Sequence, residues 1–300
     1  MEWALGITRG EDLHRISNPR EETGSTDLGG IKGAFESFGA ARLNRLYFGQ
    51  EFCERAIPTP GELREAMQRA REHKLDFTLV TPYITEKGLS KLEILFKELA
   101  AVHPAGEVVV NDWGVLYLLN KRFPTLTPIL GRLMNKILRD PRINRFIKEE
   151  NSNQMQPFRN SSLSGPYMQK LLKGLNVTRI ELDHTFQGFP PDLERWGYQL
   201  SLYIPYGCIT SGRACLFGSW GLAAQQKFNA TGKSCSGQCR FHRLMMHDRS
   251  GQVAGNHKEW RIFQKGNTVF YEQMGDFLTR GIIQAKELGF SRIVYQPEPI

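Results

Sequence analysis

Strand-like and helix-like segments alternate along most of this 300-residue chain, and this alternation constrains its fold more than any other feature. It favours parallel strands joined by crossover helices. Seven or eight such units predict an α/β fold, a TIM-barrel-like or partial (β/α) barrel with parallel strands, with a doubly wound open sheet as the alternative. Strands are expected at residues 43–49, 77–83, 107–111, 126–130, 178–183, 199–204, 268–271 and 292–295, and helices at 61–73, 87–101, 113–120, 167–175 and 274–288.

The segments outside this alternation predict an N-terminal extension, one main domain and an insertion within it. Residues 1–40 are rich in Gly, Glu, Arg and Ser and show little periodicity, so we predict a flexible N-terminal extension. We expect residues 41–300 to form a single barrel-like domain, with a cysteine-rich region at 205–245 that carries few regular signals. Residues 132–162 are basic and then polar, and contain Pro141 and Pro157, which indicates an insertion or a lid-like loop.

Composition and charge bear on where the chain is located and on which partners it can bind. No run of eighteen apolar residues is present, so we expect no membrane span. The first twenty residues lack the basic start and apolar run of a signal peptide, so the cytoplasm is the expected location. The formal net charge is +8. A basic balance favours anionic small molecules or polyanions, so a nucleic-acid partner stays open beside a merely solvated basic face.

The cysteines carry the strongest chemical signal. Four of the five lie between Cys208 and Cys239, in a chain expected to be in a reducing compartment, where clustered thiols more often bind metal or do redox work. Cys235 and Cys239 are four residues apart, and Cys215 precedes them, so these three thiolates and a fourth from elsewhere would complete a ligand set. Soft thiolates select zinc or an iron–sulfur cluster, and spacing alone does not separate the two. Buried apolar thiols are the alternative.

Polar residues at predicted strand ends are candidates for substrate binding, because barrel active sites form there. Asn111 and Asp112 follow one strand, although Asp112 could instead cap the next helix. Arg132 and Asn135 follow the next strand and could bind a carboxylate, or be a surface base and a capping amide.

Glu181 and Asp183 end a later strand and could serve acid–base chemistry, although solvated strand-end charges are commoner. His242 and His247 lie near Cys239 in sequence and could be ligands or proton donors. An ordinary surface histidine is the alternative for each.

Several motifs follow one another between residues 43 and 297. They are Leu46-Tyr47-Phe48-Gly49-Gln50-Glu51-Phe52-Cys53, Val110-Asn111-Asp112-Trp113-Gly114-Val115, Pro128-Ile129-Leu130-Gly131-Arg132-Leu133-Met134-Asn135, Tyr206-Gly207 with Ser211-Gly212-Arg213-Ala214-Cys215, and Cys235-x-x-x-Cys239-Arg240. In this order they resemble the UbiV-type iron–sulfur proteins of the collagenase-like peptidase superfamily, the peptidase U32 family. The gap between Cys215 and Cys235 is longer here than in that type.

The resemblance implies a four-iron [4Fe–4S] cluster on Cys53, Cys215, Cys235 and Cys239. Cys208 is an alternative fourth ligand, because its spacing to Cys215 is similar to that of the UbiU-type pair. The implied function is a cluster-binding subunit of an oxygen-independent hydroxylation system of the ubiquinone biosynthesis type, paired with a UbiU-like protein and using a prephenate-type anionic small molecule. An RNA-modifying hydroxylase, a collagenase-like peptidase and a zinc-stabilised interaction module are the alternatives.

Overall fold

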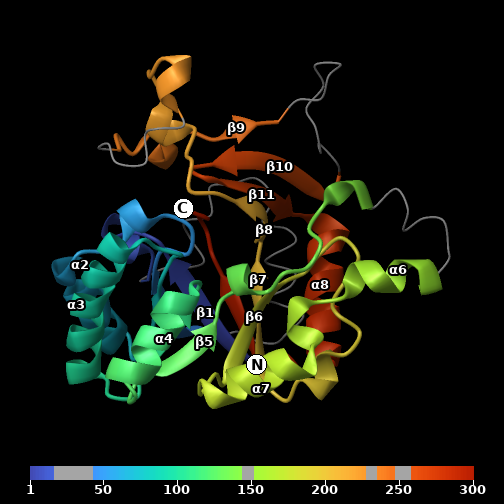
Figure 1. Ribbon diagram of the computed structural model, residues 1–300, viewed down its shortest axis with the longest axis horizontal. Coiled ribbons are helices and arrows are strands. Elements are labelled where there is room, and N and C mark those ends of the chain that lie inside the picture. The colour runs from blue at the N-terminus through green and yellow to red at the C-terminus, as the bar shows by residue number, and fades with distance from the viewer. Residues whose placement is uncertain (17–42, 144–151, 228–234, 247–257) are drawn as a thin grey trace.

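Eight parallel strands close into a barrel at the centre of the molecule (Figure 1). The computed structural model describes residues 1–16, 43–143, 152–227, 235–246 and 258–300. Around the barrel the strands follow the order β1-β12-β7-β6-β5-β4-β3-β2, and β1 closes it by pairing with both β2 and β12. The predicted fold class is therefore confirmed. The strands are β1 (Glu2–Ile7), β2 (Leu43–Gly49), β3 (Asp76–Val80), β4 (Glu107–Val110), β5 (Thr127–Leu130), β6 (Arg179–Asp183), β7 (Gln199–Ile204) and β12 (Arg292–Tyr295).

The helices lie on the outside of this barrel, where their apolar faces cover the strands. In α2, for example, a capping box between Thr59 and Glu62 fixes the first turn, and Leu63, Met67 and Ala70 are buried. None of the helices among the described residues is both long and apolar enough to cross a membrane. The helices are α2 (Pro60–Glu72), α3 (Glu86–Val102), α4 (Trp113–Arg122), α6 (Ser152–Arg159), α7 (Pro166–Gly174) and α8 (Gly275–Glu287).

The N-terminal residues differ from the prediction. Glu2–Ile7 forms the barrel strand β1, and Gly10–Ile16 forms a 3-10 helix, so the flexible extension predicted for residues 1–40 is wrong for residues 1–16. Trp3, Ala4 and Leu5 are buried because β1 is covered on both faces. The strand was missed because no periodic helix separates it from the composition-biased segment that follows. Residues 17–40 lie outside the described residues.

A second sheet of four antiparallel strands lies beyond the carboxyl ends of the barrel strands, above the barrel in Figure 1. Its order is β8-β11-β10-β9, so the region from residue 205, predicted to hold few regular elements, begins with a strand. The pairing of β8 with β11 joins segments far apart in sequence, which local patterns do not reveal. These strands are β8 (Tyr206–Ser211), β9 (Leu244–Met245), β10 (Trp260–Lys265) and β11 (Thr268–Gln273).

The segment predicted as an insertion or lid also contains regular structure in its described part. Besides α6, it forms short 3-10 turns at Arg132–Met134, Pro141–Ile143 and Ser162–Ser164. Residues 144–151 lie outside the described residues.

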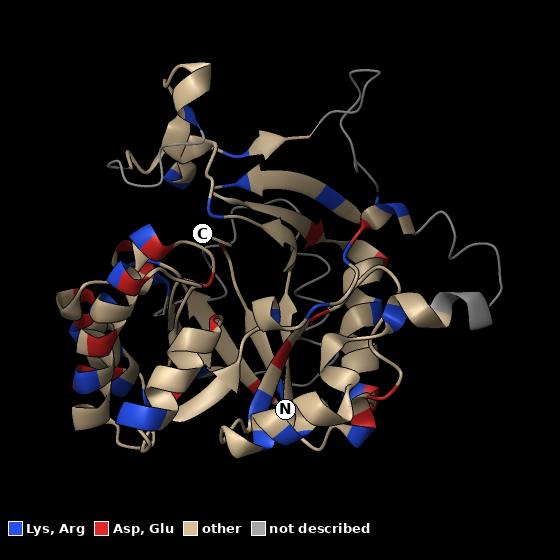
Figure 2. Ribbon diagram, in the orientation of Figure 1, with Lys and Arg blue, Asp and Glu red and all other residues tan. Residues whose placement is uncertain are grey.

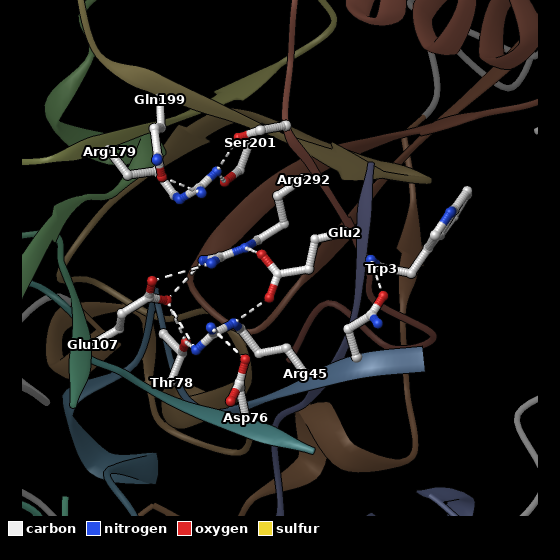
Figure 3. A network of polar contacts seen from close by, with 12 residues as sticks. Glu2, Trp3, Arg45, Asp76, Thr78, Glu107, Arg179, Gln199, Ser201 and Arg292 are labelled. Carbon is white, nitrogen blue, oxygen red and sulfur yellow. Dashed lines mark hydrogen bonds and ion pairs between the residues drawn. The ribbon is translucent and has the colours of Figure 1, made fainter. Parts of the chain in front are cut away.

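Side chains fill the interior of the barrel in layers. At the amino ends of the strands, Arg292 donates to Glu2 and Glu107, and Arg45 pairs with the same two carboxylates (Figure 3). The next layer is mostly apolar and is formed by Ala4, Tyr47, Val80, Val109, Ile129, Tyr203 and Val294. Because these layers make a packed core, a ligand site belongs at an end of the barrel.

Candidate functional site

Four cysteines line one cavity of about 120 Å³. Cys53 follows strand β2, Cys215 follows β8, and Cys235 and Cys239 flank the turn at Gly237. The structure therefore brings together the four residues that the sequence analysis grouped as ligands. The remaining lining residues are Phe52, Glu54, Arg55, Tyr83, Thr85, Arg213, Ala214, Gly218, Lys227, Gly266, Asn267 and Ile300.

Backbone N–H groups point at the sulfur atoms of this cavity. Gly218 N donates to Cys215 Sγ at 3.3 Å, and Gly237 N donates to Cys235 Sγ at 3.4 Å. Burial raises the pKa of Cys53, and hydrogen bonds from the backbone of Arg55 and Ala56 oppose that rise. Hydrogen bonds of this kind favour the thiolate, which is the form that binds metals. The backbone beside each of these sulfurs is therefore arranged to stabilise a thiolate.

Burial acts in the opposite direction. It raises the pKa of the thiols of Cys53, Cys215 and Cys239, because desolvation disfavours a lone anion. The charges of Arg9 and Lys265 offset part of this rise at Cys239. A positively charged metal group among these thiols would reverse the balance, since it deprotonates thiol ligands outright. The donor set therefore fits a thiolate-bound metal group.

The spacing of these thiols bears on which group fits. Among the described residues, no set of three or more His, Cys, Asp or Glu side chains is placed to hold a metal ion. The thiols instead surround an open space, and Gly218 borders on it. A methyl group at Gly218 would lie 3.7 Å from Cys215 Sγ and 3.8 Å from Cys235 Sγ. A side chain at this position would thus compete with any group held between the two sulfurs.

Cys208, the alternative fourth ligand, is not brought to the cavity. Its thiol is buried on β8 and packs with Phe52, Phe263 and Phe270. Burial raises its pKa to about 12. Cys208 is therefore an apolar packing residue in this structure, and Cys53 is the fourth thiol at the cavity.

Arg132 has a different role from the one predicted for it. Its guanidinium forms a bidentate pair with Glu51 (3.0 and 2.6 Å), donates to Asp183 Oδ1 (2.7 Å) and reaches Gln296 Oε1 (3.1 Å) and the backbone oxygen of Tyr206 (2.5 Å). These five contacts use all five N–H donors of the side chain, which is fully buried. No donor is left for an anionic substrate, so Arg132 holds the carboxyl end of the barrel together.

The other three candidate side chains at strand ends also form hydrogen bonds within the protein. Asn111 is buried and donates to the backbone oxygen of Thr81 at 2.9 Å. Asp112 caps α4 by accepting from the first N–H groups of that helix, which is the alternative that the sequence left open. Asn135 is buried and accepts from the hydroxyl of Ser161 at 2.6 Å. All three side chains are thus engaged in hydrogen bonds within the fold, and Asn111 and Asn135 are buried as well.

The paired carboxylates have unequal surroundings. Asp183 accepts from two arginines, Arg132 and Arg139. Glu181 is fully buried in the barrel, and burial, with a smaller effect of Glu51, raises its pKa to about 8. The hydroxyl of Tyr203 lies beside it, but neither carboxyl oxygen forms a regular hydrogen bond. Glu181 is therefore a neutral core carboxyl at pH 7.

The predicted histidines are not part of the cavity. His242 stacks on Trp220 with ring centroids 5.9 Å apart and does not line the cavity, whereas His247 lies outside the described residues. Sequence reasoning missed Tyr83 and Asn267, which do line it. The position of Tyr83 at a predicted strand end was a usable signal. Asn267 had only a Gly-Asn turn to mark it.

Comparisons with known proteins give little detail. No protein-family model matches the chain, and no curated protein matches it. Among solved structures, the U32 peptidase Mk0906 aligns over 99% of this chain and 93% of its own, with 10% identity and a TM-score of 0.43. The spore cortex-lytic enzyme SleL of Bacillus megaterium QM B1551 aligns over 98% of this chain and 70% of its own, with 10% identity and a TM-score of 0.28. At these scores neither likeness assigns a family or a function.

Proposed function

We propose that the chain is an iron–sulfur protein that binds one [4Fe–4S] cluster through Cys53, Cys215, Cys235 and Cys239. The observation that carries the proposal is that these thiols, from three separate parts of the sequence, line a single cavity of about 120 Å³. That volume is many times the roughly 10–15 Å³ that one water needs. A group of several atoms suits it better than a single ion.

Two alternatives have less support. A single zinc ion needs ligands that converge on one point, and the described residues offer no such set. A cysteine peptidase needs a base beside its nucleophile, and the described residues that line the cavity include no histidine. The thiol arrangement therefore favours cluster binding.

When bound, a four-iron cluster supplies one-electron transfer, at a potential set by hydrogen bonds to sulfur, by charge and by exposure to solvent. The chain would contribute each of these terms. The N–H groups of Gly218 and Gly237 donate to the proposed ligand sulfurs, Arg213 and Lys227 add positive charge, and Phe52 and Ile300 form an apolar part of the cavity wall.

The wider role rests on the sequence resemblance. On that basis we place the protein as the cluster-bearing subunit of an oxygen-independent hydroxylation system. Its expected partner is a UbiU-like protein of the same superfamily, and its expected substrate is a prephenate-type anion. Arg55, Arg213 and Lys227 line the cavity and give an anion a favourable charge there.

Anaerobic purification and reconstitution test the central part of this proposal. We expect about four iron and four acid-labile sulfide per chain, as one [4Fe–4S] cluster requires. A variant with Cys215, Cys235 and Cys239 all changed to Ser serves as the matched control and should bind almost no iron. A wild-type chain that takes up zinc but no iron and sulfide under these conditions would refute the cluster.

A further inference from the structure

The cysteine-bearing appendage, residues 212–227 and 235–246, has charge of one sign only. From Trp196 to His247 the sequence has no Asp or Glu, while Arg213, Lys227, Arg240 and Arg243 lie in the described appendage. Figure 2 shows Lys and Arg, and no Asp or Glu, on this part of the molecule beyond the antiparallel sheet. Arg240 lies 3.8 Å from Glu11 of the neighbouring 3-10 helix, so Arg213, Lys227 and Arg243 supply the excess of positive charge that a protein covering this face would meet.

Large apolar side chains are exposed on the same appendage. Leu216 is 50% exposed, Trp220 59% and Phe241 78%. Leu216 directly follows Cys215, and Phe241 comes two residues after Cys239. The ring of Trp220 stacks on His242, which joins the two halves of the appendage. Single exposed apolar residues are ordinary, but a group beside a cavity marks an interaction site.

We propose that the appendage is the docking surface for an acidic one-electron carrier protein, of the ferredoxin or flavodoxin class. This inference rests on the proposed cluster, which would accept the electron. The reduced carrier loses one electron and is oxidised, and the oxidised cluster gains one electron and is reduced. No covalent bond forms or breaks in this step.

Three observations favour this partner. The exposed Trp220 and Phe241 are the residue types that dominate binding energy at protein interfaces. The Lys and Arg residues of the appendage carry positive charge that an acidic protein would complement and that would speed its association. The apolar group also begins one residue from a cavity thiol, so a carrier seated on it would lie close to the proposed cluster.

Nucleic acid is the competing partner, since aromatic side chains among basic ones also bind single strands. The exposed group includes aliphatic and thioether side chains, however, at Leu216, Met245 and Met246. Such side chains offer little stacking for bases but pack well against apolar protein surface. The composition of the group therefore favours a protein.

Binding measurements on the anaerobically reconstituted chain test the proposal. The probes are an acidic plant-type [2Fe–2S] ferredoxin and a flavodoxin. One variant combines Trp220→Ala with Phe241→Ala, and a second is Arg243→Glu. The matched controls are Tyr167→Ala and Lys170→Glu on α7, where both side chains are exposed at the opposite end of the barrel (Figure 1).

We expect at least one probe to bind, with an affinity that falls as salt rises. Removing both aromatic side chains should weaken binding about tenfold or more, Arg243→Glu should weaken it as well, and the controls should stay within about twofold. Iron content, measured on the same samples, should be the same in all variants.

Several results would overturn the docking surface. They are a wild-type chain that binds neither probe, appendage variants that bind as tightly as wild type, and binding of a single-stranded RNA oligonucleotide without binding of either carrier. If iron is present in these cases, the cluster survives and only the docking surface fails. A chain that binds no iron would refute both the proposed cluster and the proposed docking surface.

Discussion

A buried group of charged side chains, centred on Arg132, links the strands at the carboxyl end of the barrel. Arg132 uses five donors within the fold, and its partners Glu51 and Asp183 are buried with it. Burial raises the pKa of Glu51, and the neighbouring Arg132 opposes that rise. Removing the cation would leave two buried carboxyl groups without their main partner.

We therefore expect Arg132→Met to lower the free energy of unfolding by about 3–5 kcal/mol, as broken buried ion pairs do. The measurement is urea denaturation of the purified chain. Arg142→Met is the matched control, because Arg142 pairs with Asp140 on the surface and its side chain is 82% exposed. The control should leave stability almost unchanged, because solvent screens an exposed ion pair. Equal effects of the two substitutions would contradict the structural role of Arg132.

Glu181 makes stability depend on pH in a definite direction. Its pKa is raised to about 8 in the folded chain, so it keeps its proton where an unfolded glutamic acid has lost it. Its contribution to stability is complete below the unfolded pKa of about 4.3 and is lost as pH rises toward 8.

In Glu181→Gln this contribution is absent, so the variant should lose less stability than wild type between pH 6 and pH 8. The difference between the two is at most about 1.4 kcal/mol per pH unit. Urea denaturation at both pH values measures it. Parallel pH profiles for the two proteins would show that Glu181 titrates normally.

The sequence anticipated some residues of the site and not others. Cys215, Cys235 and Cys239 were found because clustered thiols have few other uses in the reducing compartment expected for this chain, whereas Cys53 was assigned only through the family resemblance. The strand-end position of Arg132 was also readable, but its partners Glu51, Asp183 and Gln296 come from three other strand ends that only folding brings together. Position along the chain therefore identified where Arg132 lies without showing what it does.

Among the elements, the turn between β10 and β11 organises the cavity. The Nδ2 of Asn267 in this turn lies within hydrogen-bond distance of the backbone oxygens of Phe52 (2.6 Å) and Gly212 (2.8 Å) and of the hydroxyl of Tyr83 (2.8 Å), so its two N–H groups are shared among these acceptors. Phe52 precedes Cys53, and Gly212 lies three residues before Cys215. One side chain thus ties two cysteine-bearing loops to the antiparallel sheet.

Asn267→Ala should loosen these loops and make the cluster easier to remove. We expect iron loss to a chelator to become several-fold faster and the reduction potential to shift, because sulfur geometry and solvent exposure both change. Gln264→Ala in the adjacent strand is the control, since its side chain makes one long bond, at 3.5 Å, to the same turn. Unchanged iron loss and potential in Asn267→Ala would exclude this role.

The sequence predicted elements well where local periodicity was strong. The helices expected at residues 61–73 and 87–101 occur as α2 and α3 within two residues, because the apolar spacing of each matches the face that it buries. Strands β1, β8, β9 and β10 were missed. β1 and β8 pair with strands distant in the chain, and β8, β9 and β10 belong to an antiparallel sheet outside the repeating units.

For the whole molecule, the closed barrel leaves one end for chemistry. Ion pairs of Arg292 and Arg45 join strands from both halves of the chain at the amino ends (Figure 3). The cavity lies at the other end, where Cys53 follows barrel strand β2 and the other three thiols come from the appendage. The repeating alternation predicted the barrel, but the antiparallel sheet and its appendage depend on contacts that no local pattern encodes.

The most direct test of the cluster compares Cys53→Ala with Cys208→Ala after anaerobic reconstitution. Both substitutions remove one thiol, but only Cys53 lines the cavity, and Cys208 packs among phenylalanines. We expect Cys208→Ala to retain about four iron per chain and the electron paramagnetic resonance signal of a reduced four-iron cluster, and Cys53→Ala to lose most of both. Loss of the cluster in Cys208→Ala with retention in Cys53→Ala would contradict the ligand set proposed for this protein.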